Sequence, residues 1–556
     1  MMKIDLLWLV LFTILTIGEG RNTSNACNSN DLKGLTIFKS RIQFDTGGRL
    51  ASWSKETSCC KWKGISCDNR TGRVTEINLP GFITTEEAPV QAEMKGRLSN
   101  SITLLSSLEV IDLGGLTSLS GTIPTSIGFH LPNLRKLFLN GNSLSGSIPE
   151  SIGKLSKLEE LVLHGNRFSG SLPPSLGNLK NLNLLVLHSN QFVGSIPESF
   201  SNLTNLVHLD LHGNSLTGHI PQRIGQLKVL KELDLSSNLL VGEIPPSLAN
   251  LTAISLVSLD TNHLTGKIPP TLGHLVSLHR LSLADNKLEG AIPSSLGNLS
   301  ALNQLYLNGN RFSGQIPKSI GCGIQGEIPE YLRKAPIEEL DLSDNKLTGS
   351  IPTWIGNFSQ LNILNLSRNS LVSKIPDSIT DLNQLIVIDL HANKLAGSIS
   401  QVFQIRQSFP YDSLKHVDLS DNNFSSGIEQ IGERPQHDMQ FLNLSSNILR
   451  GKIPKSVERL KALQSLDLSS NKLSFNLPES LGNLSKLETL KLQKNQFNDR
   501  IPNGFLKLRK LKKLDLSDNL LAGKIPEGKP LSDFSKSSYS GNKGLCGKPL
   551  KPCKHT

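Results

Sequence analysis

The sequence predicts an α/β solenoid: a right-handed superhelix with a parallel β-sheet on its concave side, short 3-10 or helical segments on its convex side and a disulfide cap at each end. Two observations predict this fold. An asparagine recurs every 24 residues from Asn142 to Asn310, and cysteines gather near the two ends of the chain. A fixed period of this length indicates stacked coils of one repeating unit and not a series of separate globular domains.

Each repeat follows the pattern L-x-x-L-x-L-x-x-N-x-L-x-G-x-I-P, as at residues 134–149. The L-x-L alternation predicts a short strand in which every second side chain points inward. One coil alone cannot bury these leucines, but stacked coils can. The asparagine after the strand is expected to be buried, because its amide can satisfy backbone groups of the turn. The asparagines expected to form this ladder are Asn142, Asn166, Asn190, Asn214, Asn238, Asn262, Asn286, Asn310, Asn345, Asn369, Asn393, Asn422, Asn447, Asn471, Asn495 and Asn519.

Short motifs within the repeats and at both ends resemble the plant extracellular class of the leucine-rich-repeat family. The repeat motifs are S-G-S-I-P at residues 145–149, T-G-H-I-P at 217–221 and A-G-K-I-P at 522–526. C-x31-C-C-x-W-x-G-I-x-C at residues 27–67 is similar to the family's N-terminal cap. G-N-K-G-L-C-G-K-P-L-K-P-C at residues 541–553 is similar to its C-terminal cap. The resemblance covers nearly the whole mature chain.

The cysteines are interpreted as structural disulfides of an oxidising compartment. The family resemblance implies the pairs Cys27–Cys59, Cys60–Cys67 and Cys546–Cys553, whereas the sequence alone leaves the connectivity open. Zinc ligation by the front four cysteines is disfavoured, because they contain no C-x2-C pair.

Residues 1–20 are predicted to be a signal peptide, with Ala26 as a later cleavage point. A basic Lys3 precedes a twelve-residue apolar run at 6–17, which is too short to span a bilayer. The remaining boundaries are an N-terminal cap at 27–80, about seventeen repeats at 81–530 and a C-terminal cap at 531–556. We therefore expect a protein secreted to the extracellular space or cell wall, with association to the plasma membrane through a partner as an alternative.

Three repeats depart from the pattern. The repeat at Leu113 has one extra residue and lacks the asparagine, and about five residues are inserted within 398–413. The interval from Asn310 to Asn345 is 35 residues instead of the 48 of two repeats, so we infer a half-repeat scar near 316–330. Cys322 then occupies an asparagine position, as a semi-buried thiol or, alternatively, a reactive one. A local break in sheet curvature is expected there, and a smooth, unbroken strand ladder would refute it.

Sequons for N-glycosylation support the secretory route. Because an Asn/Ser-rich repeat creates sequons at equivalent positions, the set counts as one observation. The sequons are Asn22, Asn69, Asn202, Asn250, Asn298, Asn357, Asn365, Asn423, Asn443 and Asn483.

No catalytic residue, cofactor or resident metal is predicted. Catalysis needs side chains that converge in a pocket, and an open solenoid offers few of them. Residues 321–326 match G-x-G-x-x-G but follow no strand of a βαβ unit, so dinucleotide binding is disfavoured. The chain is therefore predicted not to be an enzyme.

A histidine-rich group is the most unusual surface that the sequence encodes on the concave face. It could be a solvated feature of the repeat or a binding site for a protein ligand with an apolar centre. A metal site through His188, His208, Asp210 and His212 is disfavoured, because strand geometry does not guarantee convergence. The residues of this candidate site are Phe138, Val162, His164, Leu184, Val186, His188, His208, Asp210 and His212.

Further along, outward positions on the concave face become polar. They form either a solvated consensus surface or a docking strip for a second protein, which sugars on Asn365 or Asn443 would partly obstruct. One column contains Asp341, Asn365, Asp389, Asp418, Asn443, Asp467 and Asp515, and the next contains Ser343, Ser367, Ser420, Ser445, Ser469 and Ser517.

Positive charge is concentrated at the C-terminal end. Residues 501–556 hold 12 Lys/Arg and 4 Asp/Glu, which gives +8 of the chain's net +11. Acidic polysaccharide such as demethylated pectin is a better extracellular partner than nucleic acid, although a solvated basic end explains the charge equally simply. The candidate residues are Lys507, Arg509, Lys510, Lys512 and Lys513.

The resemblance implies two functions. Receptor-like proteins without a kinase sense peptides, proteins or wall fragments in plant defence or development and signal through a receptor kinase or co-receptor. Polygalacturonase inhibitors of the same family block a microbial wall hydrolase with fewer repeats. The repeat number favours receptor-like recognition, and the end of the chain shortly after Cys553 favours a secreted protein or a truncated receptor. Hydrolase inhibition remains the alternative.

Overall fold

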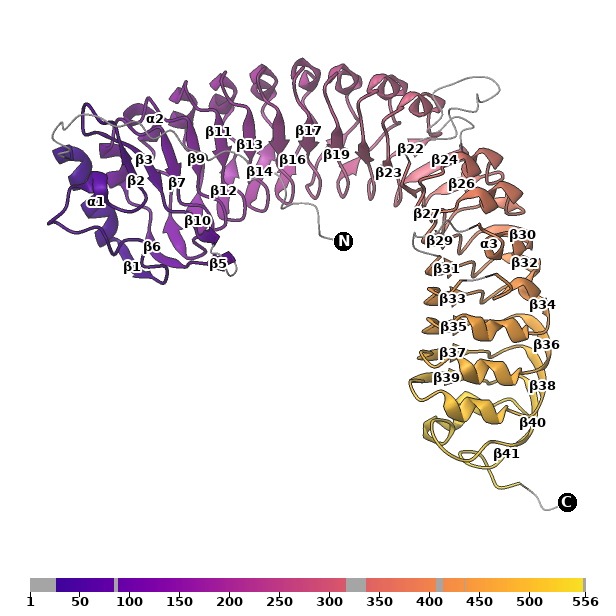
Figure 1. Cartoon of the computed structure of the whole chain (residues 1–556). Coiled ribbons are helices and arrows are strands. Elements are labelled where there is room, and N and C mark those ends of the chain that lie inside the picture. The colour runs from indigo at the N-terminus through magenta and orange to yellow at the C-terminus, as the bar shows by residue number, and fades with distance from the viewer. Residues whose placement is uncertain (1–26, 85–88, 317–336, 407–413, 435, 554–556) are drawn as a thin grey trace.

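The structure is a row of stacked coils with a cap at each end. The computed structural model describes residues 27–84, 89–316, 337–406, 414–434 and 436–553. Figure 1 shows the coils following one another along an extended, bent arc, with the N-terminal cap and the C-terminal cap at opposite ends. This arrangement confirms the predicted solenoid.

A long parallel sheet lines the concave side. Its strands stack in chain order, and β2 joins antiparallel to β3 at the N-terminal edge. The strands are β2 (Ile65–Cys67), β3 (Val74–Asn78), β7 (Val110–Asp112), β9 (Lys136–Phe138), β11 (Glu160–Val162), β13 (Leu184–Val186), β15 (His208–Asp210), β17 (Glu232–Asp234), β19 (Leu256–Ser258), β21 (Arg280–Ser282), β23 (Gln304–Tyr306), β25 (Glu339–Asp341), β27 (Ile363–Asn365), β29 (Val387–Asp389), β31 (His416–Asp418), β33 (Phe441–Asn443), β35 (Ser465–Asp467), β37 (Thr489–Lys491) and β39 (Lys513–Asp515).

A second set of strands forms small outer sheets, most of them after a ladder asparagine, and β4 (Phe82–Thr84) and β5 (Pro89–Gln91) form a hairpin. The outer strands are β1 (Ile42–Asp45), β6 (Met94–Arg97), β8 (Leu119–Gly121), β10 (Ser143–Gly146), β12 (Arg167–Ser171), β14 (Gln191–Ser195), β16 (Ser215–Thr217), β18 (Val241–Gly242), β20 (His263–Leu264), β22 (Glu289–Gly290), β24 (Arg311–Gln315), β26 (Lys346–Thr348), β28 (Val372–Ser373), β30 (Lys394–Ser398), β32 (Asn423–Ser426), β34 (Arg450–Gly451), β36 (Lys472–Asn476), β38 (Gln496–Asp499), β40 (Leu520–Lys524) and β41 (Gly544–Cys546).

Helical segments are short, apart from α1 in the N-terminal cap, and most of them form the convex side. The α-helices are α1 (Ser29–Ser40), α2 (Ile127–His130) and α3 (Ser400–Phe403). The 3-10 segments are η1 (Cys59–Lys61), η2 (Asn100–Leu104), η3 (Glu150–Lys154), η4 (Pro174–Asn178), η5 (Glu198–Asn202), η6 (Ile224–Gln226), η7 (Pro246–Asn250), η8 (Pro270–His274), η9 (Ser294–Asn298), η11 (Thr353–Asn357), η12 (Asp377–Asp381), η13 (Ile428–Gln430), η14 (Lys455–Arg459), η15 (Glu479–Asn483), η16 (Asn503–Lys507), η17 (Leu531–Asp533) and η18 (Lys536–Tyr539).

The core is a continuous column of leucines that the strand register aligns. Leu161, at the centre of β11, pairs with Leu137 on one side and Leu185 on the other. All three side chains are buried. Full burial of one leucine side chain contributes roughly 1.5–3 kcal/mol, and only the neighbouring coils supply the apolar surface that makes this burial complete.

The asparagine ladder forms as predicted. Asn166 donates hydrogen bonds from Nδ2 to the carbonyl groups of Leu139 and Leu163, at 2.9 and 3.0 Å. Its Oδ1 accepts from the backbone N–H of Leu144 in the preceding coil, at 3.0 Å. Each buried amide therefore ties its own coil to the one before it.

The two ends of this ladder differ from its middle. Oδ1 of Asn142 is buried without a hydrogen-bond partner among the described residues, because the repeat before it has an extra residue and no ladder asparagine. At the other end, Asn542 donates to the carbonyl of Leu516 and accepts from the N–H of Leu521. The sequence interpretation ended the ladder at Asn519 and missed Asn542, whose signal is its place 23 residues later in the C-terminal cap.

The strand ladder continues across the long interval between Asn310 and Asn345. β23 pairs with β25, so that Leu305 lies opposite Leu340. Asn345 donates to the carbonyl of Leu307 at 2.9 Å, as the immediate neighbour of Asn310 in the ladder. The interval therefore adds one lengthened coil to the sheet, and strand pairing is continuous across it, while the expected break in sheet curvature near 316–330 stays a prediction.

Figure 1 shows the row of coils changing direction beyond β23. The strands remain paired through this change of direction, β23 with β25 and β25 with β27. Cys322 and the rest of the proposed scar lie outside the described residues.

The shorter insertion leaves the sheet undisturbed. The coil that contains the insertion keeps a convex segment, α3, which packs with the convex segments η12 and η13 of the neighbouring coils. Leu395 still donates to Oδ1 of Asn422, at 3.0 Å, and β29 still pairs with β31. Residues 407–413 lie outside the described residues. The extra length is therefore accommodated away from the concave face.

Disulfides close both caps, with the pairs Cys27–Cys59, Cys60–Cys67 and Cys546–Cys553 that the resemblance implied. In the N-terminal cap, Trp53 and Trp62 stack with ring centroids 5.1 Å apart. In the C-terminal cap, the buried Tyr539 donates its hydroxyl to the carbonyl of Leu531. In the described parts of the chain, no helix has the length and apolar character needed to cross a bilayer. The predicted signal peptide lies outside the described residues and stays a prediction.

Candidate ligand-binding face

Three histidines form a stack across the concave sheet. His164, His188 and His212 each follow a strand by two residues, and the 24-residue register places them side by side on neighbouring coils. Adjacent ring centroids are 4.3 Å apart in both pairs, with interplanar angles of 10° and 11°. The predicted histidine column therefore exists as one continuous aromatic surface.

Asp210 lies beside this stack and contacts two of its members. His212 Nδ1 is 2.9 Å from one carboxylate oxygen of Asp210, and His188 Nε2 is 3.9 Å from the other. The backbone N–H of His212 also donates to Asp210. Asp210 is thus fixed in place as the shared partner of both imidazoles.

The pKa values of His188 and His212 are shifted in opposite directions. Burial, reinforced by repulsion from the neighbouring histidines, lowers the pKa of His188 to about 4 despite the attraction of Asp210. The hydrogen bond to Asp210 raises the pKa of His212 above its usual value, although burial opposes it. Burial also lowers the pKa of His164. At mildly acidic pH, the stack therefore combines a neutral central ring with a charged ring at its end.

His208 belongs to a second ion pair on the same face. Its Nδ1 lies 2.7 Å from a carboxylate oxygen of Glu232 on the next strand. Burial lowers the pKa of His208, but the hydrogen bond and charge of Glu232 outweigh it, so the net shift is upward. The acidic edge of the face continues with Asp234, which lies 3.9 Å from His212.

This arrangement favours hydrogen bonding over metal ligation. The ligand atoms of His188, Asp210 and His212 lie within 4.8 Å of one another. Because the two rings are stacked nearly parallel, the lone pairs of their nitrogens run side by side and do not converge on one point, as a metal ion would need. His208, the fourth residue of the predicted set, is engaged by Glu232.

The apolar part of the predicted site is less accessible than expected. Phe138, Val162 and Leu184 are half-buried. Val186 is only 9% exposed, between Val162 and Asp210 on the neighbouring strands, so the expectation that it contributes open apolar surface is wrong. The face is therefore mainly polar, with a narrow apolar margin.

A second cluster on the same sheet was missed from the sequence. Tyr306 hydrogen-bonds through its hydroxyl to Glu339 on the next strand, and the guanidinium of Arg280 lies 5.3 Å from the centre of the Tyr306 ring. Burial and the neighbouring Glu339 raise the pKa of Tyr306. The available signal was Tyr306 at the third strand position, where Asp and Ser are otherwise common.

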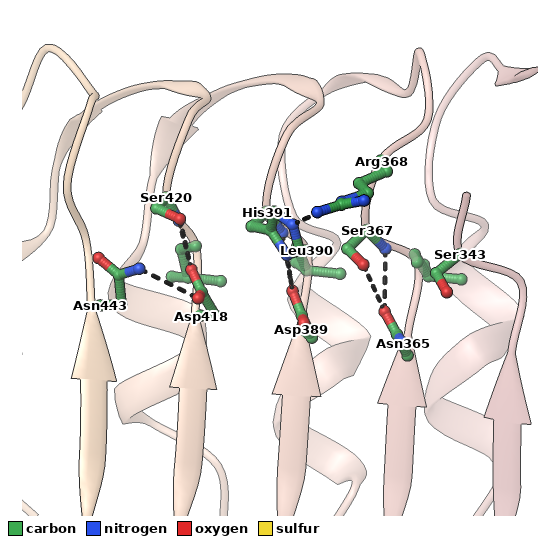
Figure 2. A network of polar contacts seen from close by, with 12 residues as sticks. Ser343, Asn365, Ser367, Arg368, Asp389, Leu390, His391, Asp418, Ser420 and Asn443 are labelled. Carbon is green, nitrogen blue, oxygen red and sulfur yellow. Dashed lines mark hydrogen bonds and ion pairs between the residues drawn. The ribbon is translucent and has the colours of Figure 1, made fainter. Parts of the chain in front are cut away.

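The side chains of the predicted polar strip hydrogen-bond to one another (Figure 2). Ser367 donates its hydroxyl to Asn365 at 2.7 Å, and Ser420 donates to Asp418 at 2.6 Å. Asn443 links the next coil by donating Nδ2 to Asp418 at 3.0 Å. Each serine thus holds the carboxylate or amide two residues before it in its own coil, and the asparagines link neighbouring strands.

The same network contains an imidazole. His391 Nδ1 lies 2.7 Å from Asp389, and Arg368 donates to its other ring nitrogen at 3.4 Å (Figure 2). Because these side chains are already partnered, the strip favours the interpretation of a rigid, solvated consensus surface over that of an open docking strip.

The basic residues near the C-terminal end are all solvent-exposed. Lys507 ends η16 and Lys513 begins β39, so the cluster surrounds one connection between the convex and concave sides. Lys512 forms an ion pair with Glu488 at 2.7 Å. The remaining four cations have no ion pair within the described structure.

Most predicted glycosylation sites are accessible. Asn69, Asn202, Asn250, Asn298, Asn423 and Asn483 are exposed and Asn357 is half-buried. Asn365 and Asn443 are half-buried in the polar strip, where Nδ2 donates to Asp341 and Asp418 respectively. Occupancy of these sequons stays a prediction, and Asn22 lies outside the described residues.

Comparison with known proteins identifies the repeat. A leucine rich repeat N-terminal domain model matches residues 28–68, and leucine rich repeat models match residues 106–168, 336–395 and seven shorter segments between 181 and 530. The ectodomain of the Arabidopsis receptor kinase HAESA, solved with an N-terminally extended IDA peptide hormone, superimposes with a TM-score of 0.73. It is 32% identical over 94% of this chain and 85% of that chain. The chain belongs to the leucine-rich-repeat family.

This leucine-rich-repeat protein also resembles a plant peptide hormone receptor, RGFR1 in complex with RGF2. The TM-score is 0.69 and the identity 32%, over 81% of this chain and 77% of that chain. Among sequence relatives, Phytosulfokine receptor 1 of Arabidopsis thaliana is 36% identical over 23% of this chain and 12% of its own length. Receptor-like protein EIX2 of Solanum lycopersicum is 33% identical over 25% and 14%.

The matched segments thus span only a small part of these curated relatives. The fold of this leucine-rich-repeat protein is that of plant receptor ectodomains, which is typical of ligand-binding receptors and not of enzymes.

Proposed function

We propose that this leucine-rich-repeat protein is a secreted, receptor-like recognition protein without a kinase. It binds an extracellular peptide or protein on the concave face of β9–β17 and acts in plant defence or developmental signalling through a membrane receptor kinase or co-receptor. The observation that carries the proposal is the histidine stack with its shared Asp210, because it is a rigid, partly desolvated polar group on an exposed sheet. The likeness to two peptide-bound receptor ectodomains supports it.

The chemistry of the face indicates the kind of ligand. Asp210 and Glu232 present carboxylate oxygens, while the neutral His188 can donate from one ring nitrogen and accept at the other. A ligand with cationic or amide groups can pair with the carboxylates, and its apolar side chains can pack on Phe138 and Val162. Hydrogen bonds made at a partly desolvated, preorganised site favour affinity because little ordering is needed on binding.

The experiment is a pull-down from apoplastic fluid with the glycosylated protein, compared with a variant carrying His188→Ala and His212→Ala. We expect the specific ligand to be lost from the variant, with a change in the pH dependence of capture. His274→Ala, at the exposed end of η8 on the convex side, is the matched control. Equal capture and equal pH dependence in all three proteins would contradict the proposal. Inhibition of fungal polygalacturonase by the purified protein would instead favour the alternative of a hydrolase inhibitor.

The exposed basic cluster supports a second, separate role in retention by the cell wall. Lys507, Arg509, Lys510 and Lys513 are free of ion pairs within the described structure and lie around one turn. We propose that they hold the protein on acidic pectin, because clustered cations attract a polyanion through their summed field.

A further inference from the structure

The N-terminal cap contains a pocket of about 440 Å³ beside the first strands of the concave sheet. It lies between the loop that carries Arg49, the strands β2 and β3, and the start of the β4–β5 hairpin at Phe82. Its volume is within the range of small-molecule and peptide-end binding sites. The pocket is separate from the histidine stack, and none of its lining residues belongs to the proposed ligand-binding face.

Arg49 lines this pocket, and its side chain is buried without a hydrogen-bond partner for Nε in the described structure. The side chain is only 7% exposed. No carboxylate of the described residues comes within 4.0 Å of it. Burial lowers the pKa of Arg49, and Asp45 and Asp112 oppose that shift from a longer range. A buried guanidinium N–H without a hydrogen-bond partner is costly, and an anion that accepts from it would remove that cost.

The walls around Arg49 are held in place before any ligand arrives. The disulfide Cys60–Cys67 fixes the start and end of the segment that contains β2. The indole N–H of Trp53 donates to the carbonyl of Lys63 at 3.0 Å, and the N–H of Lys63 donates to Ser52 at 2.9 Å. A rigid site loses little conformational freedom on binding.

Close packing also restricts Arg49 itself. A Cβ atom on Gly47 would lie 3.3 Å from Cγ of Arg49 and 3.0 Å from Cβ of Ala92. The aliphatic stem of Arg49 therefore lies against Gly47, where a larger residue would crowd it.

The remaining lining residues define the ligand. Lys63 adds a second positive charge and Glu76 one negative charge, so the lining residues carry a net charge of about one positive unit, with Asp45 and Asp112 acting on Arg49 from outside the lining. This lining suits a monoanion. Ser66 and Asn78 supply hydrogen-bonding groups. Ile65 and Phe82 supply apolar surface, and the ring of Phe82 is 65% exposed at the rim.

From this combination we propose that the cap pocket binds a carboxylate attached to an apolar or aromatic group, with Arg49 as the residue that receives the carboxylate. Such a group can come from the C-terminal residue of a peptide or from a free aromatic acid. The inference does not depend on the function proposed for the concave face.

The test measures binding of three probes to the full-length protein by ligand-observed NMR titration. N-acetyl-phenylalanine represents a peptide terminus, phenylacetate represents a free aromatic acid, and N-acetyl-phenylalaninamide is the neutral control. We expect both acids to bind and the amide to bind at least tenfold more weakly, which is the scale of one charge-assisted hydrogen-bonded contact. Tighter binding of N-acetyl-phenylalanine than of phenylacetate assigns the peptide source, and the reverse order assigns the free acid.

Variants locate the site. Arg49→Gln is expected to weaken N-acetyl-phenylalanine by roughly tenfold or more, whereas Arg41→Gln, an exposed arginine of the same cap, leaves it unchanged. Since Arg49 is buried, Asn78→Asp serves as a second test at an exposed wall position, where an added negative charge repels the carboxylate without disturbing the core. Equal binding of acid and amide, or unchanged binding in Asn78→Asp and Arg49→Gln, overturns the proposal and leaves Asp45 and Asp112 as the only partners of Arg49.

Discussion

One carboxylate serves two imidazoles on the concave face, and they respond to it differently. His212 is directly hydrogen-bonded to Asp210, whereas His188 lies 3.9 Å away between two other rings. The difference between these two distances to Asp210 therefore favours the charged form of His212 over that of His188. A raised pKa means that His212 contributes stability at low pH, which is lost as pH rises through its folded-state pKa. A lowered pKa means that His188 costs stability as pH falls from its unfolded pKa toward about 4.

The Asp210→Asn variant tests this coupling. It removes the charge that holds the proton on His212, so the loss of stability should be larger at pH 5, where His212 is protonated, than at pH 8. Thermal unfolding midpoints at the two pH values measure it. Asp515→Asn is the matched control, because Asp515 has the same column position but accepts from Ser517, where Asp210 has His212, and has no histidine beside it on β37 or β39. An equal loss at both pH values in Asp210→Asn would show that the carboxylate does not set the protonation of His212.

A ladder asparagine offers a second test at the scale of one residue. Asn238 donates to three carbonyl groups and accepts from the N–H of Leu216. Asn238→Leu should lower the free energy of unfolding by roughly 1–3 kcal/mol for each backbone group left unpaired. Chemical denaturation measures the loss. Asn503→Leu, at an exposed asparagine, should change stability little, and equal effects at both positions would contradict the structural role of the ladder.

The sequence predicted the strands and turns well, because at each of their positions one residue type has one structural role: leucine fills the core and asparagine hydrogen-bonds the turn. The L-x-L pattern located β11 and β13, and the asparagine located the turn after each. The sequence is less informative where the number of residues between two strands departs from the repeat. The 35-residue interval before Asn345 forms one coil, as the hydrogen bond from Asn345 to the carbonyl of Leu307 shows. Residue spacing alone cannot distinguish a lost coil from a lengthened one.

The candidate site was predicted only in part, for a related reason. Its histidine column follows from the 24-residue period, and so does the place of Asp210. Side-chain exposure does not follow from the period, because neighbouring strands decide it, and Val186 is buried for that reason. The cluster of Tyr306 and Glu339 joins residues from strands whose separation in sequence departs from 24, so no fixed spacing pointed to it.

The basic connection between η16 and β39 is testable as an element. Lys510→Glu together with Lys513→Glu should make the protein elute from de-esterified pectin at lower salt, because the attraction is electrostatic and screened by ions. Lys346→Glu together with Lys394→Glu makes the same change in net charge at exposed positions elsewhere. If both double variants elute together, net charge and not the cluster governs retention.

At the scale of the whole molecule, each coil is stabilised mainly by packing against the coils next to it. A coil contacts mainly its two neighbours, so a solenoid has nearest-neighbour energetics and needs its ends covered. The described C-terminal cap does this with the buried Tyr539, the ladder residue Asn542 and a disulfide. Damage at one end should therefore remain local at first.

Replacing Cys546 and Cys553 with serine tests that locality. Hydrogen exchange should become faster in β39–β41 and stay unchanged in β9–β15, because the intervening coils keep their own neighbours. Amide exchange monitored by mass spectrometry provides the measurement. A uniform increase along the chain would mean that the solenoid opens as one cooperative unit.

The lengthened coil before Asn345 and the α3 insertion both leave the paired strands in step. The place of each strand is therefore set by its neighbour in the ladder and not by a residue count, so the columns on the concave face keep their alignment across intervals of different length. Members of this family are best superposed asparagine by asparagine, since a fixed offset of 24 assigns the wrong neighbour to every position beyond Asn310.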